Sequence, residues 1–262
     1  MKPILIRFAN DAYIHSGHFM LFLGGLAAVI VLALEMRRTG EKPEKIYPLL
    51  FLLLISTLLG ARLLYCMDFN NKFQYSLVDV LKFWRGGLAL HGGAVFAVAT
   101  GVLYIHWRQL DFWKIADLFT PPVALFIALA RVGCILTGCC YGKPCDPDFP
   151  LAITFTDYET LAPRYVPLYP TQAWFATAAL LVFVVVWVRK NRKGFEGEAA
   201  LLGVSLFSLL AFIIEFFRAD LRVLYEIGGV ALSQNQIIGA AVFLAATGLY
   251  FYRRVGSASS EE

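Results

Sequence analysis

The chain has 262 residues, of which 59% are hydrophobic and 16% are charged, and its net charge is +4 at pH 7. A soluble domain has roughly 45–50% apolar and about 25% charged residues, so this composition excludes an ordinary soluble enzyme and indicates a membrane protein. Basic clusters beside anionic lipid headgroups explain the small positive charge, and we expect no nucleic-acid partner.

Apolar stretches of about 20 residues, long enough to cross a bilayer core, occur seven times along the chain. We therefore expect an all-α integral membrane protein with seven transmembrane helices, packed as one domain over residues 1–254. Basic residues follow the first stretch and no small-residue cleavage pattern is visible, which favours a retained helix over a signal peptide. The predicted spans are 18–36, 47–67, 88–107, 114–137, 170–188, 198–217 and 231–252.

Basic residues predict the orientation of these helices, because Lys and Arg in short loops stay on the cytoplasmic side. One set of alternate loops carries dense basic clusters, such as the one at 189–193, whereas the other set spreads its basic residues over longer loops. We expect the dense side to be cytoplasmic. The N-terminus and the end of the fourth span then lie outside, and the C-terminus lies inside.

The outer connection 138–169 differs from the other loops because it contains five prolines and an alternating piece, Ala152–Phe155, that favours a short strand. We expect this segment to form a lid or a platform for lipid headgroups. Residues 255–262 are small or acidic and predict a disordered tail.

Two polar positions lie in or beside the second and third spans. Arg62 follows Gly60 and Ala61, and it either binds a ligand or extends its charged end to the membrane interface. His91-Gly92-Gly93 opens the third span. His91 is either a proton acceptor or a partner of an interhelical carbonyl, in which case the glycines serve tight helix packing.

Arg131 lies inside the apolar run 121–136, which contains no acid to neutralise it. A guanidinium is costly there, and its planar fork suits phosphate, so we interpret this residue as functional. Glu215 lies in the sixth span. It has either a catalytic role or a structural ion pair with Arg131, Arg62 or Arg218.

Four cysteines, Cys134, Cys139, Cys140 and Cys145, lie within twelve residues at the outer end of the fourth span. Three interpretations stay open: a disulfide of Cys139 or Cys140 with Cys145, small packing residues, or a thiol or metal site. The spacing matches no common zinc or iron–sulfur pattern, which makes the thiol or metal site the weakest of the three interpretations, and we expect no cofactor.

Polar residues also open the fifth and seventh spans, at 169–172 and 233–236. The amides of Gln172 and Gln236 suit the glycerol hydroxyls or ester carbonyls of a lipid. Capping of the helix N-termini explains both motifs equally well.

These motifs form an ordered set that spans about residues 50 to 250. The set comprises Trp84-Arg85-Gly86-Gly87 with His91-Gly92-Gly93, Asp117 with Pro121, Arg131 through Gly142, Tyr169-Pro170-Thr171-Gln172, and Phe212-Ile213-Ile214-Glu215-Phe216 with Arg218. In this order the chain resembles the prolipoprotein diacylglyceryl transferase family.

The resemblance implies a seven-helix transferase of the bacterial inner membrane that uses no metal. Such an enzyme moves a diacylglyceryl group from phosphatidylglycerol, an anionic phospholipid, to the lipobox cysteine of a prolipoprotein. The resemblance implies catalytic roles for His91, Arg131 and Glu215. We expect substrate binding by Arg62, Gly92, Gly93, Tyr141, Gly142, Gln172, Arg218 and Gln236.

The chain departs from the family pattern directly after Arg131. The usual run Gly-Arg-x-Gly-Asn-x-x-Asn-Gly-Glu appears here as residues 130–139, with Cys134, Thr137 and Cys139 in place of the two asparagines and the glutamate. Thiols therefore stand where the family has polar groups.

A second departure removes a positive charge, because Ala211 occupies the position where the family carries an arginine four residues before Glu215. Loss of such a group costs roughly 3–4 kcal/mol of transition-state stabilisation unless Arg62 or Arg218 replaces it. Two alternatives on the same fold follow: a membrane thiol or metal-binding protein that uses the cysteines with His91, and a noncatalytic phospholipid-binding protein.

Overall fold

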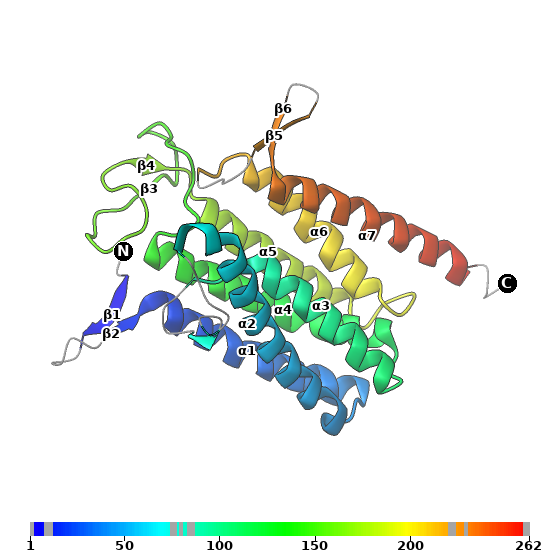
Figure 1. The fold of residues 1–262 in the computed structure, drawn as a ribbon. Coiled ribbons are helices and arrows are strands. Elements are labelled where there is room, and N and C mark those ends of the chain that lie inside the picture. Colours follow the sequence, from blue (N-terminus) through cyan, green and yellow to red (C-terminus); the bar gives the residue numbers. More distant parts are fainter. Residues whose placement is uncertain are drawn as a thin grey trace. The chain divides into compact units, whose positions relative to one another are not determined.

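Seven helices make up most of the chain that the structure describes (Figure 1). The structure is a computed structural model, and it describes residues 3–7, 13–73, 78, 81–82, 87–219, 224–227 and 230–258. Each helix overlaps one predicted span, which confirms the all-α membrane fold. The helices are α1 (Ser16–Thr39), α2 (Pro43–Phe73), α3 (Leu90–Trp107), α4 (Phe112–Thr137), α5 (Thr171–Arg189), α6 (Glu198–Glu215) and α7 (Gln234–Ala258).

Six of the seven described helices, all except α3, are long and apolar enough to cross a membrane. The chain is therefore a multi-pass membrane protein. Helix α3 has 18 residues, and at 1.5 Å per residue it is about 27 Å long, close to the thickness of a bilayer core. Its crossing of the membrane stays a prediction.

Three short antiparallel hairpins lie between or before the helices. Strand β3 (Ile153–Thr154) pairs with β4 (Pro167–Leu168), which confirms the strand expected at Ala152–Phe155. The other two hairpins were not predicted. They are β1 (Ile4–Arg7) with β2 (Tyr13–His15), and β5 (Leu224–Ile227) with β6 (Val230–Ser233).

Helix α7 continues through Ala258, so the disordered tail expected from residue 255 does not begin there. Residues 255–258 extend the helix, and 259–262 lie outside the described residues. The same holds for Trp84, Arg85 and Gly86, the first residues of the motif set.

One compact unit comprises residues 1–34 and 116–262, and it contains α5, α6, α7 and most of α4. Its core is apolar, since Ala124, Val182, Val186 and Ala199 from α4, α5 and α6 are buried together. In water, burial of a valine side chain contributes roughly 1.5–3 kcal/mol to stability. In a bilayer the surrounding lipid is itself apolar, so close packing between the helices is the main force that holds them together.

Asp117 of α4 fixes the start of α6 within this unit. Its carboxylate accepts hydrogen bonds of 2.9 Å from the backbone N–H groups of Gly197 and Ala200, and it pairs with Lys193 at 3.2 Å. Free N–H groups at a helix start favour a negative charge, so this buried acid acts as a cap supplied by a neighbouring helix.

The outer segment 138–169 has a small core of its own. Phe155, Ala162 and Leu168 are buried there, and Tyr141 and Val166 pack against them. The segment is therefore folded around a core of its own, while its role as a lid or a headgroup platform stays a prediction.

Residues 35–115 form the second compact unit, in which α2 and α3 pack closely. A Cβ atom on Gly92 would lie 2.3 Å from the carbonyl oxygen of Gly60, and one on Gly93 would lie 3.0 Å from that of Thr57. Only glycine permits such an approach of two backbones. The packing interpretation of the His91-Gly92-Gly93 motif is therefore confirmed for its glycines.

We predict that Gly92→Ala destabilises the protein and that Gly101→Ala, on the same helix, does not. The new methyl group at 92 would press on the backbone of α2, and such overpacking costs roughly 1–3 kcal/mol. At 101 the nearest side-chain atom is 3.6 Å away, and alanine favours a helix over glycine by up to about 1 kcal/mol. Thermal unfolding in detergent checks this, and equal midpoints for the two variants would contradict it.

Candidate functional site

The segments that follow α4 and α6 lie together on one side of the larger unit. Backbone hydrogen bonds join the segment after α4 to the segment after α6: Lys143 N–H donates to Phe217 at 2.7 Å, and Ala219 N–H donates to Tyr141 at 3.2 Å. Between these two hydrogen bonds, Gly142 and Arg218 form an isolated antiparallel β-bridge. The thiol-rich turn is therefore tied to the end of the helix that carries Glu215.

Arg131 lies in the last turns of α4 and is only partly buried. Its guanidinium carbon lies 4.4 Å from the centre of the Phe175 ring on α5, a cation–π contact. Within the part of the chain that the structure describes, Arg131 makes no hydrogen bond or ion pair. Its fork of N–H donors is therefore available to an anionic ligand.

The turn after α4 depends on two residues in the left-handed region. Gly138, with φ of 77°, ends the helix, and a Cβ there would lie 2.1 Å from Oγ1 of Thr160. Cys140 has φ of 56°, a conformation that is uncommon for residues other than glycine. Such strain is held in place by surrounding contacts and is frequent at functional sites.

The start of α5 supplies those contacts. Thr171 Oγ1 donates to the carbonyl of Cys140 and Gln172 Nε2 donates to that of Cys139, both at 3.0 Å. Both side chains are buried, and neither caps α5. The capping interpretation is therefore wrong at this helix, and the amide of Gln172 holds the turn. Contact of Gln172 with a lipid stays a prediction.

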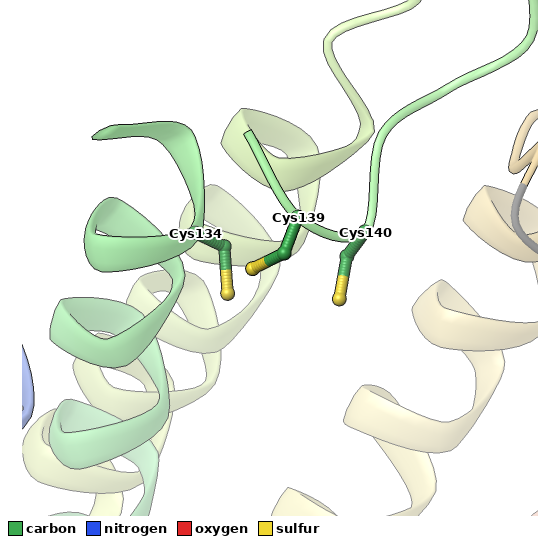
Figure 2. Close-up of side chains that lie close together, drawn as sticks. All are labelled: Cys134, Cys139 and Cys140. Carbon is green, nitrogen blue, oxygen red and sulfur yellow. The ribbon is translucent and has the colours of Figure 1, made fainter. Parts of the chain in front are cut away.

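This arrangement brings three thiols together. The sulfur atoms of Cys134, Cys139 and Cys140 all lie within 4.8 Å of one another, and Figure 2 shows them on the same side of the turn. Thr137 Oγ1 donates to Cys139 Sγ at 3.4 Å. All five cysteines are free, so the expected disulfide to Cys145 is not formed, because Cys145 lies outside this group.

Two arginines influence the thiol of Cys140. Hydrogen bonds from Cys134 and Cys139, and then the positive charges of Arg131 and Arg218, hold the pKa of Cys140 well below its usual range. The lowered pKa favours the thiolate form at Cys140, and both guanidiniums contribute to it.

Glu215 forms the structural ion pair that the sequence allowed, with Arg218 as its partner. Its two carboxylate oxygens accept hydrogen bonds of 3.2 and 3.0 Å from Arg218 Nη1, and Asn235 donates to the same carboxylate at 2.6 Å. Glu215 is buried. The pairing fixes Arg218 near the thiols, and sequence reasoning missed Asn235 although it lies in the polar run 233–236.

At the start of α7 the capping interpretation is confirmed. Ser233 N–H donates to Gln236 Oε1 at 2.9 Å, and Gln236 N–H donates to Ser233 Oγ at 3.1 Å. This reciprocal pair is a capping box. Gln236 is buried, so its amide oxygen serves the helix, and lipid contact by Gln236 stays a prediction.

Two residues of the smaller unit were also expected in the site. Arg62 is fully buried and donates to the carbonyls of Gly87 at 3.0 Å and Lys82 at 3.1 Å; its binding of a ligand and its extension to the interface both stay predictions. His91 is exposed on the first turn of α3, and the described residues give it no interhelical carbonyl partner. Its availability agrees with a proton-accepting role, which stays a prediction.

Comparison with known proteins decides the family. The family model described as prolipoprotein diacylglyceryl transferase matches residues 3–252. The chain belongs to this family. A phosphatidylglycerol–prolipoprotein diacylglyceryl transferase of Clostridium tetani is 32% identical over 96% of this chain and 97% of its own length.

Other transferase-family relatives agree over most of their length. A phosphatidylglycerol–prolipoprotein diacylglyceryl transferase 2 of Clostridium perfringens is 29% identical over 91% of this chain and 90% of its own. A phosphatidylglycerol–prolipoprotein diacylglyceryl transferase of Thermotoga maritima is 30% identical over 84% of this chain and 75% of its own length. The family-model match therefore includes α1 to α6 and most of α7.

Compared with the family pattern, the residues that differ directly after Arg131 belong to the thiol group or contact it. Cys134 and Cys139 stand where an asparagine and the glutamate are usual, and Thr137, in place of the second asparagine, donates to Cys139. The substitutions are thus neighbours in space. Tyr141 packs in the outer core and Gly142, buried, would clash with the Tyr169 carbonyl if it carried a Cβ.

We predict that alkylation of Cys140 in chelator-treated, reduced protein changes little between pH 8 and pH 6. Its pKa lies well below this interval, so the thiolate persists. Cys145 is the internal control, because burial and the charge of Asp146 raise its pKa, and its thiolate falls about tenfold per pH unit. Peptide mapping by mass spectrometry after brief exposure to a small alkylating reagent checks this. Parallel loss of reactivity at both cysteines would contradict it.

Proposed function

We propose that this chain transfers a diacylglyceryl group from phosphatidylglycerol to the lipobox cysteine of a prolipoprotein. Family membership supports this activity, since the relatives are named for it. The observation that carries the proposal is the guanidinium of Arg131, which has no ion-pair partner among the described residues and lies at the end of a membrane helix. A lone cation at that depth suits the phosphate of an anionic lipid.

The reaction needs a thiolate and stabilisation of a departing phosphate. The acceptor thiol loses its proton to a base, the role that the family resemblance implies for His91, and its sulfur attacks the glycerol carbon that bears the phosphate. A C–S bond forms, and the C–O bond breaks with its electron pair on the leaving glycerol phosphate. The negative charge on the phosphate grows from one to two during the reaction. A cation such as Arg131 therefore stabilises the transition state more strongly than it stabilises the bound lipid substrate.

Arg218 supplies the second positive charge that Ala211 no longer provides. Its charge acts on the same thiol as that of Arg131, and Glu215 with Asn235 holds it in place. Glu215 is therefore a positioning residue in this proposal. Arg62 is engaged by backbone carbonyls and is the weaker candidate.

We further infer that the protein lies in the bacterial inner membrane with its N-terminus outside and its C-terminus in the cytoplasm. The dense basic cluster Arg189, Lys190, Arg192 and Lys193 joins α5 to α6, at the ends opposite to the thiol turn. Short basic loops stay cytoplasmic. The thiol turn then opens to the outer side, where a prolipoprotein signal segment presents its cysteine.

A direct assay tests the activity. Purified protein in detergent is incubated with phosphatidylglycerol vesicles and a synthetic lipobox peptide, and mass spectrometry follows the peptide. We expect a mass gain of one diacylglyceryl group on the cysteine, and none on a peptide with Cys→Ser. An unmodified thiol with every anionic phospholipid tried would overturn the proposal.

We predict that Arg131→Ala lowers the turnover number about 10²–10³-fold, the usual loss for removal of one transition-state electrostatic donor. Arg131→Lys keeps the charge and loses the fork, so it should retain an intermediate rate. Arg164→Ala is the matched control, because Arg164 is exposed on the outer segment. Steady-state rates with the peptide assay check the order, and an Arg131→Ala enzyme with the rate of the control would contradict it.

A further inference from the structure

The thiols of Cys134, Cys139 and Cys140 form a group that neither the family pattern nor the mechanism above explains. We propose that they bind one Zn²⁺ ion with an open fourth position, and that the acceptor cysteine of the prolipoprotein occupies this position as a thiolate. The first half concerns metal binding alone. The second half rests on the proposed function.

The spacing of the sulfur atoms carries the first half. Zinc–sulfur bonds are about 2.3 Å long, so ligands at tetrahedral angles lie about 3.8 Å apart. The three sulfur atoms here lie within 4.8 Å of one another and on the same side of the turn (Figure 2). A closure of at most about 1 Å therefore completes three corners of a tetrahedron.

The backbone is built to present these sulfur atoms. Cys140 adopts the left-handed conformation, and Thr171 and Gln172 hold the carbonyls of Cys140 and Cys139. If the cysteines served only as small packing residues, the strained backbone at Cys140 and the two buried hydrogen bonds from Thr171 and Gln172 would not be needed. Outer contacts of this kind orient ligands in metal sites, where their loss commonly weakens binding 10–100-fold.

The charges nearby suit a divalent cation. Three thiolates with Zn²⁺ leave one negative charge, and Arg131, Arg218 and Glu215 together contribute one positive charge. Before the acceptor thiolate binds, the assembly is then neutral, which a site of low dielectric constant favours. Thiolates are soft ligands that select Zn²⁺ over hard cations such as Mg²⁺.

The fourth position distinguishes this site from a structural zinc site. Within the described ranges, no fourth His, Cys, Asp or Glu joins the three thiols. Three protein ligands with one exchangeable position are the arrangement of catalytic zinc sites, whereas structural sites have four. The neighbouring hydroxyl of Thr137 is engaged with Cys139.

A thiol that binds zinc loses its proton, which is the step that the transfer reaction needs. The acceptor thiol would release its proton to solvent and bind as thiolate. Its sulfur lone pair then forms the C–S bond, the C–O bond to phosphate breaks, and glycerol phosphate leaves with the electron pair. The zinc ion keeps its three protein thiolates and its oxidation state.

Metal content is measured first, on the full chain purified in detergent under reducing conditions and incubated with Zn²⁺ alone. We expect one zinc per chain after removal of free metal. Cys134→Ser, Cys139→Ser and Cys140→Ser should each weaken binding more than about 100-fold, beyond the loss of an outer contact. Cys145→Ser is the matched control and should bind as the wild type does. Circular dichroism and gel filtration verify that each variant is folded.

A cobalt experiment on the unmodified chain keeps the test independent of the variants. Co²⁺ bound by three thiolates shows strong sulfur-to-metal absorption and visible bands of a four-coordinate ion. We expect a lipobox peptide to shift the visible bands, and the same peptide with Cys→Ser to leave them unchanged. This readout requires thiol binding and no lipid transfer.

The outcomes separate the two proposals. No zinc above that of a triple-serine variant, or equal zinc in the single variants, would overturn the metal site. If cobalt binds but its visible absorption bands do not shift when the cysteine peptide is added, the role of the fourth position is overturned. Full transfer by zinc-free protein would overturn the role of the fourth position and leave the proposed function intact. Metal and peptide binding without any transfer would support the site and contradict the proposed function.

Discussion

A guanidinium in the last turns of a membrane helix is the constraint on which the rest of the site depends. Arg131 faces an aromatic ring, and no acid among the described residues neutralises it. A charge at that depth is costly unless an anion or a water-filled space compensates for it. The family's phospholipid substrate would supply the anion, and Cys140 already experiences the positive field.

The thiol turn is adapted to this charge through the backbone. A left-handed glycine ends α4, a strained cysteine follows, and two buried side chains of α5 hold the carbonyls. Glu215 and Asn235 hold Arg218 on the other side. Two thiols and a threonine, Cys134, Cys139 and Thr137, replace three polar residues of the family pattern, and they lie in this frame beside the charges of Arg131 and Arg218.

Hydropathy predicted the helices because the bilayer demands about 20 apolar residues for each crossing, whatever the tertiary packing. The polar motifs were harder to interpret, because a polar residue at a helix start can cap that helix or can hydrogen-bond to another segment, and the sequence alone does not distinguish the two. Gln236 closes a capping box, whereas Gln172 reaches across to another segment. Only the tertiary structure separates these two cases.

The errors have physical causes as well. Hairpin β5–β6 had a signal that we overlooked, since Gly228-Gly229 separates two short runs with strand-forming residues. The disulfide to Cys145 was wrong, because spacing along the chain does not describe a turn with Cys140 at positive φ. That conformation folds the second and third thiols back toward Cys134.

A structure of the protein with phosphatidylglycerol bound is the most direct measurement. We expect a phosphate oxygen within about 2.7–2.9 Å of an Arg131 guanidinium nitrogen, the distance of a charge-assisted hydrogen bond. A lipid phosphate held elsewhere, with Arg131 closed in a pair with an acid, would contradict the central role of this cation.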